Sequence, residues 1–341
     1  MNSSSQPIHQ AKRRWTPFIG YVFAAAALLW VFHGIRPSVL RQEYAAVNWP
    51  LALAGMIFDI GRYVSQSIRW KLLLSSFCTI SVFKTFRALY AGVFINMLFP
   101  LRIGEVARAF IVSRSTCSRF SSALSSLFVE YLFDGIWLGL GIGLSALCLP
   151  LPPQIAGAAR IFGIAVVIAV AGFCYIVARD IPVLEHQLAS SHGLVRATLI
   201  RLTGLLHKIR AGIHAMSRSR FFAASFFLSG ANLFFHMGAF WIIMKAYGIH
   251  LPFFIAAAVM LFVFVGLIIP NAPSNVGSFQ FFCVIALMAV GIDKTQAAGF
   301  SLLVFVLVSI PQITIGFIAF AGSGKTFSEI KNEIARLRRT E

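Results

Sequence analysis

The sequence predicts an all-α fold, a polytopic transmembrane helix bundle. Hydrophobic residues make up 58% of the 341 residues, whereas charged residues make up only 12%. The mean hydropathy is +0.82, and a soluble domain of this length cannot bury so much apolar surface. The apolar residues also gather into runs of roughly 20, the length that spans a bilayer as a helix. We therefore expect a multi-pass membrane protein rather than a soluble enzyme.

Six uninterrupted apolar runs are the predicted spanning helices. The first run follows Lys12, Arg13 and Arg14, as a signal peptide would. It is long, however, and no small-residue cleavage motif follows it before Pro37, so we expect a retained first helix. The six predicted spans cover residues 17–32, 49–67, 122–149, 161–177, 221–247 and 297–321.

Two further apolar regions are interrupted near their middles. Leu89–Ile111 is broken by Phe99–Glu105, and Pro252–Val290 is broken by Pro270–Gly277. Both interruptions contain Pro, Gly or Asn, which disrupt helices. We expect each region to form a broken or re-entrant helical hairpin.

Basic residues predict the orientation. With the N-terminus inside and each broken region counted as an even number of passes, 23 of the 29 Lys and Arg residues fall on inside segments and five on outside segments. The first broken region then enters from the cytoplasmic side and the second from the outer side. This pattern predicts an inverted repeat with halves at about 49–149 and 221–321.

The same pattern defines the expected domain organisation. A cytoplasmic tail at 1–16 precedes a single transmembrane domain at 17–322, and a charged cytoplasmic tail follows at 323–341. The segment 179–220 joins the two halves and combines an apolar stripe with many basic residues. It is expected either to lie on anionic inner-leaflet lipids or to pack on the protein's own cytoplasmic face.

The net charge of +18 would suggest nucleic acid as the partner of a soluble protein. Here the basic residues lie between apolar runs, so anionic lipid headgroups are the simpler partner and no nucleic acid is expected. The five cysteines are scattered and lack metal-ligand spacing. The run Gly322–Thr326 resembles the end of a phosphate loop, but Ala319 stands where that pattern needs Gly. The sequence predicts no catalytic residue, metal site or cofactor.

The first broken region carries the densest polar cluster, with Asn96, Arg102, Glu105 and Arg108 close together. The two arginines lie three residues either side of Glu105, so a helix would bring all three together. One reading is a polar pocket in which the arginines bind a phosphate and Glu105 pairs with them or with a cationic group. The other reading is an interfacial loop whose charges face the cytosol.

The second broken region is uncharged and offers Asn275, Gly277 and Gln280. Half-helix ends in this region could present backbone N–H groups to an anion. The alternative is a kinked hairpin that only packs.

Four ionisable residues lie within predicted spans, where they are costly. Asp59 and Arg62 share one helix face, and Glu130 and Asp134 share another. The second pair is a candidate proton or cation site, or a partner for Arg62 or Arg69; a structural salt bridge between helices is the competing reading. On a later helix, Asn232 and His236 share a face and are expected to bridge helices.

Four stretches in this order resemble the lysylphosphatidylglycerol synthase transmembrane-domain family, which is flippase-like: Ser67–Leu74, Asn96–Glu105, Val129–Asp134 and Pro270–Gln280. The resemblance covers about residues 15–322. The residues that match the family pattern are Arg69, Asn96, Pro100, Arg102, Gly104, Glu105, Arg108, Glu130, Asp134, Pro270, Pro273 and Gly277.

The chain departs from the family pattern in two places. The usual Pro-Gly-Gly stands as Pro273-Ser274-Asn275, and the usual Glu stands as Gln280. These departures imply a second hairpin that binds a different headgroup or lacks a proton site. The chain also has no soluble aminoacyl-transferase domain, so alone it is not expected to make an aminoacyl lipid.

The resemblance implies a lipid flippase or transporter, and not an enzyme, in the bacterial cytoplasmic membrane. Its substrate would be an anionic or polyprenyl-linked lipid of envelope or glycolipid biosynthesis. The alternatives are a membrane-embedded lipid-modifying enzyme and a non-catalytic partner in a biosynthetic complex, and a homo-oligomer is possible. The expected substrate-binding residues are Arg69, Asn96, Arg102, Glu105, Arg108, Asn275, Gly277 and Gln280. The expected proton- or charge-coupling residues are Asp59, Arg62, Glu130 and Asp134.

Overall fold

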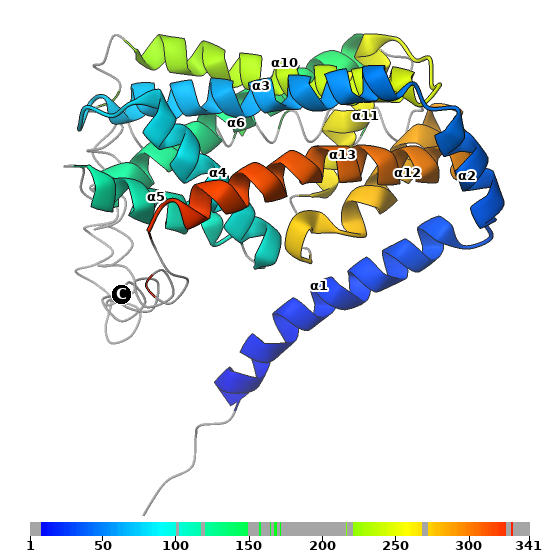
Figure 1. Ribbon diagram of the computed structural model, residues 1–341, viewed down its shortest axis with the longest axis horizontal. Coiled ribbons are helices and arrows are strands. Elements are labelled where there is room, and N and C mark those ends of the chain that lie inside the picture. The colour runs from blue at the N-terminus through cyan, green and yellow to red at the C-terminus, as the bar shows by residue number, and fades with distance from the viewer. Residues whose placement is uncertain are drawn as a thin grey trace, which may run out of the picture. The chain divides into compact units, whose positions relative to one another are not determined.

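The computed structural model is all-helical over the part of the chain that it describes (Figure 1). The described residues are 8–99, 102–116, 120–148, 221–267 and 272–324, with residues 157, 164, 167, 168, 171, 216 and 329. The helices are α1 Ile8–Phe32, α2 Pro37–Ala45, α3 Trp49–Leu74, α4 Val82–Leu98, α5 Gly104–Ser115, α6 Phe120–Cys148, α10 Phe222–Ala246, α11 Phe253–Gly266, the short 3-10 helix η1 Pro273–Asn275, α12 Ser278–Ala289 and α13 Lys294–Ala321.

Three of these helices are long and apolar enough to cross a membrane: α6 over Phe120–Ser145, α10 and α13. The pair Gly20–Phe32 and Pro37–Ala45, bent by 78°, adds a fourth if it forms one span. The predicted span at 49–67 lies inside α3, which is helical throughout but carries Asp59 and Arg62 and is not among the three. The expected multi-pass helical membrane protein is therefore confirmed.

Large apolar side chains on the outside of the helices are consistent with a lipid-facing surface. The exposed fraction is 74% for Leu29, 69% for Phe254 and 69% for Ile318. In water, so many exposed apolar side chains would favour association with other apolar surfaces, whereas lipid tails solvate them.

Both predicted helix breaks are confirmed. The first separates α4 from α5, and the second separates α11 from α12 with η1 between them. Non-glycine residues in the left-handed region lie at both breaks, namely Arg102 with φ 50°, Ser274 with φ 57° and Asn275 with φ 56°. Since bulky L residues rarely adopt this conformation, the surrounding structure must hold these turns in place.

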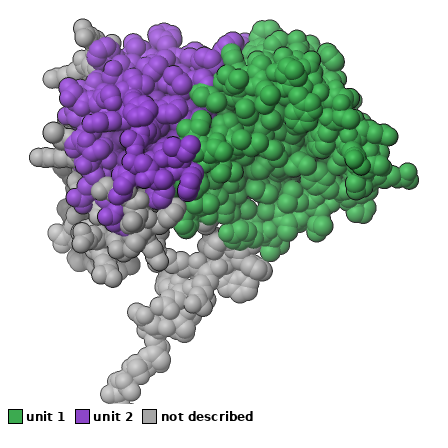
Figure 2. All heavy atoms as spheres, in the orientation of Figure 1, with its two compact units in different colours: residues 1–60, 93–104, 236–315 green, residues 61–92, 105–235, 316–341 purple. Residues whose placement is uncertain are grey.

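The chain divides into two compact units (Figure 2). The boundary between them falls within five helices, α3, α4, α5, α10 and α13. Unit 1 comprises residues 1–60, 93–104 and 236–315, and unit 2 comprises residues 61–92, 105–235 and 316–341. The predictions for 161–177 and 179–220 lie outside the described residues, except for the isolated residues 164, 167, 168, 171 and 216, as does most of the tail at 323–341. The inverted repeat, the membrane orientation and the single domain at 17–322 stay predictions.

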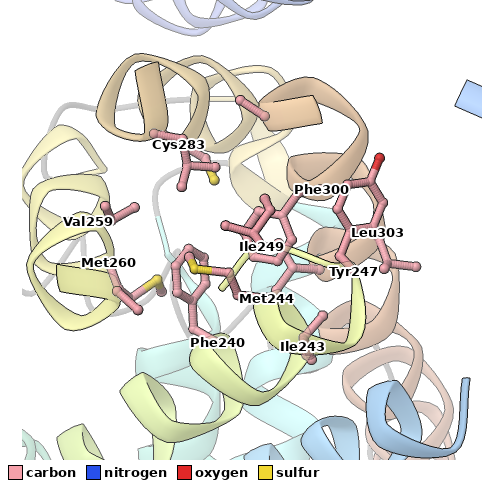
Figure 3. Packing of buried hydrophobic residues seen from close by; sticks show 14 of the residues in the cluster. Phe240, Ile243, Met244, Tyr247, Ile249, Val259, Met260, Cys283, Phe300 and Leu303 are labelled. Carbon is pink, nitrogen blue, oxygen red and sulfur yellow. The ribbon is translucent and has the colours of Figure 1, made fainter. Parts of the chain in front are cut away.

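Unit 1 has a large hydrophobic core, built mainly from α10, α11, α12 and α13 (Figure 3). Phe240, Met244, Met260, Cys283 and Phe300 are all buried there. Their neighbours are apolar on every side, and flexible Met side chains fill the gaps between rings. This core fixes α11 and α12 and therefore holds the second break.

Helix α1 packs along α12 within unit 1. The contact is closest at Gly277, where an added Cβ would lie 2.4 Å from the carbonyl oxygen of Ala24. Gly277 also has a φ of 81°. Only glycine fits this position, because both its conformation and the approach of α1 exclude a side chain.

Candidate functional site

Five charged side chains form a continuous chain of ion pairs in unit 2. In order they are Glu105, Arg108, Glu130, Arg69 and Asp134, so negative and positive groups alternate. They come from three helices, with Arg69 on α3, Glu105 and Arg108 on α5, and Glu130 and Asp134 on α6. Glu130 is the centre of this charge chain, because its Oε1 accepts from Arg69 and its Oε2 accepts from Arg108.

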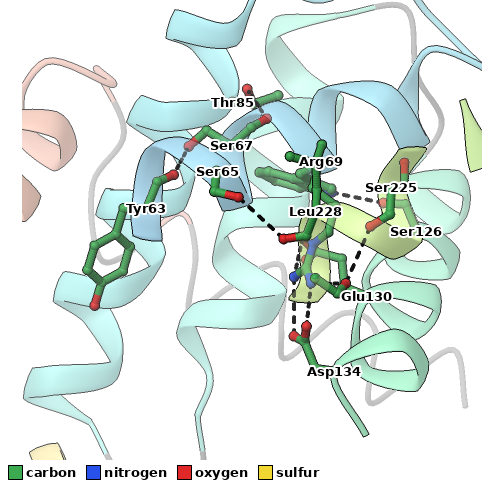
Figure 4. A network of polar contacts seen from close by, with 12 residues as sticks. Tyr63, Ser65, Ser67, Arg69, Thr85, Ser126, Glu130, Asp134, Ser225 and Leu228 are labelled. Atoms are coloured by element: carbon green, nitrogen blue, oxygen red, sulfur yellow. Dashed lines mark hydrogen bonds and ion pairs between the residues drawn. The ribbon is translucent and has the colours of Figure 1, made fainter. Parts of the chain in front are cut away.

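Arg69 points toward Glu130 and Asp134 (Figure 4), and every donor of its guanidinium is occupied. Its Nε and Nη2 lie 3.2 Å and 3.0 Å from Glu130 Oε1, and its Nη2 lies 3.2 Å from Asp134 Oδ2. Its Nη1 donates to Asp134 Oδ1 and, at 2.5 Å, to Ser229 Oγ on α10. A guanidinium has five N–H donors, so these five contacts use all of them. Arg69 is fully buried and ties α3 to α6 and α10.

Arg108 has fewer partners than Arg69, although it is 2% exposed. Its Nε lies 2.6 Å from Glu105 Oε2, and its Nη2 lies 2.8 Å from Glu130 Oε2. Its guanidinium carbon lies 4.8 Å from the ring centre of Trp70, a cation–π distance. Trp70 is itself fixed by donating to Ser126 Oγ at 2.9 Å. Nη1 of Arg108 is buried and has no hydrogen-bond acceptor among the described residues.

The two ends of the charge chain are the parts that solvent or lipid can reach. The side chains of Asp134 and Glu105 are 35% and 25% exposed, whereas those of Arg69, Glu130 and Arg108 are 3% exposed or less. The charge chain holds three carboxylates against two guanidinium groups. One negative charge therefore remains if all five groups are ionised, and carboxylates occupy both accessible ends.

The first break is closed by a side-chain cap. Asn96 Oδ1 accepts from the backbone N–H of Gly104 at 2.7 Å, which satisfies a donor at the start of α5. The expectation that one helix holds Arg102, Glu105 and Arg108 is wrong, because α5 begins only at Gly104. Arg102 lies in the turn before it, where it is exposed and its Nη2 lies 3.4 Å from the Leu267 carbonyl oxygen.

The second break is closed in a similar way. Gln280 Oε1 accepts from the backbone N–H of Gly277 at 2.8 Å, and Gln280 is 2% exposed. Ser274 Oγ donates to the Met97 carbonyl oxygen at 2.9 Å, and Met97 lies near the end of α4. This bond and the Arg102–Leu267 contact join the two breaks within unit 1. Asn275 lies beside Ser274 in η1 and is half-buried.

The other charged residues of the predicted spans, Asp59 and Arg62, are not members of the charge chain. In unit 1, Asp59 Oδ1 lies 2.9 Å from His236 Nδ1, and the His236 ring stacks on Phe264 with centroids 5.0 Å apart. The expected bridge between helices by His236 is confirmed, because it joins α10 to α3. In unit 2, the Arg62 guanidinium lies 4.1 Å from the ring centre of Tyr63.

Sequence reasoning found the five charged residues but missed the groups around them. It left open whether Arg62 or Arg69 pairs with Glu130 and Asp134, and the structure shows Arg69. It missed Ser229, because a serine in an apolar helix gives no distinct signal. It also missed Trp70, although its position next to Arg69 in a matching motif could have drawn attention to it. Among the described residues, no group of His, Cys, Asp and Glu could hold a metal ion.

Comparison with known proteins identifies the family of this chain. The family model for the lysylphosphatidylglycerol synthase TM region matches residues 18–316. No curated protein and no solved structure matches the chain. The matched range contains both helix breaks and all five members of the charge chain, and it covers most of the sequence. The chain therefore belongs to the family of the lysylphosphatidylglycerol synthase transmembrane region.

Proposed function

We propose that this chain is a lipid flippase or transporter of the bacterial cytoplasmic membrane, with both termini in the cytoplasm. The buried charge chain of α3, α5 and α6 carries this proposal. Ionisable groups inside a membrane domain are costly, so they are retained mainly where they serve binding, transport or proton movement. Membership of a lipid-related family supports a lipid as the substrate.

A purely structural role explains this charge chain less well. Replacing a buried ion-pair network by apolar residues of similar volume is often neutral or stabilising. A structural network would also gain from closed ends, whereas Glu105 and Asp134 are both partly exposed. A polar site that a headgroup can approach accounts for both features.

The two joined breaks supply a route for the headgroup. Irregular backbone at membrane depth is tolerated where protein buries it or where it lines a polar cavity. The acyl chains would stay in the bilayer while the headgroup passes the polar residues. The distribution of basic residues supports cytoplasmic termini, and the basic segment 179–220 would then face anionic lipids of the inner leaflet.

The proposal is tested by lipid translocation in proteoliposomes. Purified wild-type protein is expected to move at least one lipid of a panel of fluorescent phospholipids and glycolipids between leaflets, and Glu105→Gln to reduce the rate by about tenfold or more, because it removes an accessible charge from the site. Glu43→Gln is the matched control, since Glu43 lies outside the charge chain, where it accepts a hydrogen bond from Tyr247.

The melting temperature of each variant shows whether it is folded. Wild-type rates in a folded Glu105→Gln protein would contradict a role of the charge chain in transport. Failure of the wild-type protein to move any of a panel of phospholipids and glycolipids would overturn the flippase proposal itself.

A further inference from the structure

The two buried arginines of the charge chain differ in what they can still bind. Arg69 uses all five donors on Glu130, Asp134 and Ser229. A ligand could bind it only by displacing one of these partners. Arg108 is equally buried, yet its Nη1 has no acceptor among the described residues. Since a buried donor without an acceptor is rare and unfavourable, this atom is the place in the charge chain where a ligand gains most.

The charge around Arg108 restricts the kind of ligand. Arg108 lies between Glu105 and Glu130, and the whole charge chain has three carboxylates for two guanidinium groups. A phosphate oxygen would add a second unbalanced negative charge in a region of low dielectric constant, where like charges repel strongly. A headgroup hydroxyl supplies the missing acceptor without adding charge. The balance of charge therefore favours an uncharged oxygen.

We propose that Nη1 of Arg108 donates to an uncharged oxygen, a hydroxyl of the transported lipid headgroup, and that Arg69 is a structural residue. This inference rests on the proposed function, and it names the binding atom and narrows the class of substrate to neutral, hydroxyl-rich headgroups. Glu105 is the accessible neighbour of Arg108, because it pairs with Nε of Arg108 and its side chain is 25% exposed.

Trp70 provides a direct readout of binding at Arg108. Its ring lies 4.8 Å from the guanidinium carbon, so a ligand at Nη1 changes the electrostatic environment of the indole. The full chain is placed in phosphatidylcholine nanodiscs, and the probe is either glucosyl diacylglycerol or phosphatidic acid. The chain has six Trp residues, so the signal is assigned to Trp70 by its loss in Trp70→Phe.

The expected result is a saturable fluorescence change with glucosyl diacylglycerol and a much weaker one with phosphatidic acid. Arg108→Lys is expected to lower the glucosyl lipid affinity by about tenfold or more, because a lysine nitrogen held between two carboxylates does not extend to the position of Nη1. Arg87→Lys is the matched control, since Arg87 is a half-buried arginine outside the charge chain that donates to the Gly322 carbonyl oxygen. It is expected to bind as the wild type does.

Three outcomes overturn the inference. These are Arg108-dependent binding of phosphatidic acid in preference to the glucosyl lipid, equal affinity of folded Arg108→Lys and wild type, and no binding of the glucosyl lipid at all. The proposed function fails separately. If the glucosyl lipid binds through Arg108 but no lipid is translocated, the binding site is supported and the flippase function is contradicted. If Arg108→Lys translocates lipids at wild-type rates, the flippase function is supported and the role of Arg108 Nη1 in headgroup binding is contradicted.

Discussion

The two helix breaks have similar backbone caps, but the helices that follow them differ in charge. At each break, one amide side chain caps the start of the following helix, Asn96 on Gly104 and Gln280 on Gly277. The helix after the first break brings Glu105 and Arg108 into the charge chain, whereas α12 after the second break contains no charged residue. A helix break and a charged site are therefore separable features. Only the first break is followed by a helix that belongs to a charged site.

We expect the largest loss of stability when a buried charge is removed from the charge chain. Arg69→Met leaves Glu130 and Asp134 without their shared partner, and removing one member of a buried ion pair costs about 3–5 kcal/mol. The corresponding change beside the second break, Ser278→Ala, removes a buried hydroxyl that has no acceptor among the described residues, so we expect almost no loss. Thermal unfolding in detergent measures both. Equal shifts in melting temperature would remove the contrast between the two regions.

The second break should instead be sensitive to added bulk. Gly277→Ala combines a φ of 81° with a Cβ 2.4 Å from the Ala24 carbonyl oxygen, and we expect a loss of about 2–4 kcal/mol and loosening of α1. Gly34→Ala is the matched control, because Gly34 has a φ of 79° but nothing within 4 Å of an added Cβ. It should lose only about 1–2 kcal/mol.

Thermal unfolding of the two glycine variants, together with cysteine cross-linking of α1 to α12, separates backbone strain from the clash with α1. If the added Cβ clashes with α1, Gly277→Ala lowers the melting temperature more than Gly34→Ala does. If Gly34→Ala were as damaging, the approach of α1 to α12 would not be the cause.

We expect the smallest loss of stability when a side-chain cap at a helix break is removed. Asn96→Ala removes the acceptor for the Gly104 N–H, and loss of such a cap costs about 1 kcal/mol. Asn96→Asp keeps an oxygen at the same place and should stay near wild type. Hydrogen exchange at the first turn of α5 reports the change locally. An unchanged exchange rate in Asn96→Ala would show that the cap does not hold this turn.

The sequence predicted the parts of the molecule that depend on local pattern. Long apolar runs predicted α6, α10 and α13, and Pro, Gly and Asn predicted both breaks. The spacing of Glu105 and Arg108 predicted their ion pair, since residues three apart meet on a helix. Arg102 was misplaced, because the spacing argument assumed a helix that in fact begins two residues later.

The contacts between distant segments were beyond such reasoning. Arg69 and Glu130 are separated by 61 positions, and only the packing of α3 on α6 decides which carboxylate meets which arginine. His236 and Asp59 are 177 positions apart. Arg69 and Arg108 differ in which of their guanidinium nitrogens have a hydrogen-bond acceptor. The sequence does not distinguish them in this respect, because both are arginines.

We propose that the charged site after the first break receives a lipid headgroup. The most direct test is an experimental structure of the full chain in native lipid. We expect headgroup density within hydrogen-bonding distance of Arg108 Nη1, with Arg69 still bound to Glu130, Asp134 and Ser229. Tight side-chain packing around Arg108, with lipid only on the outer surface of the helices, would contradict the account.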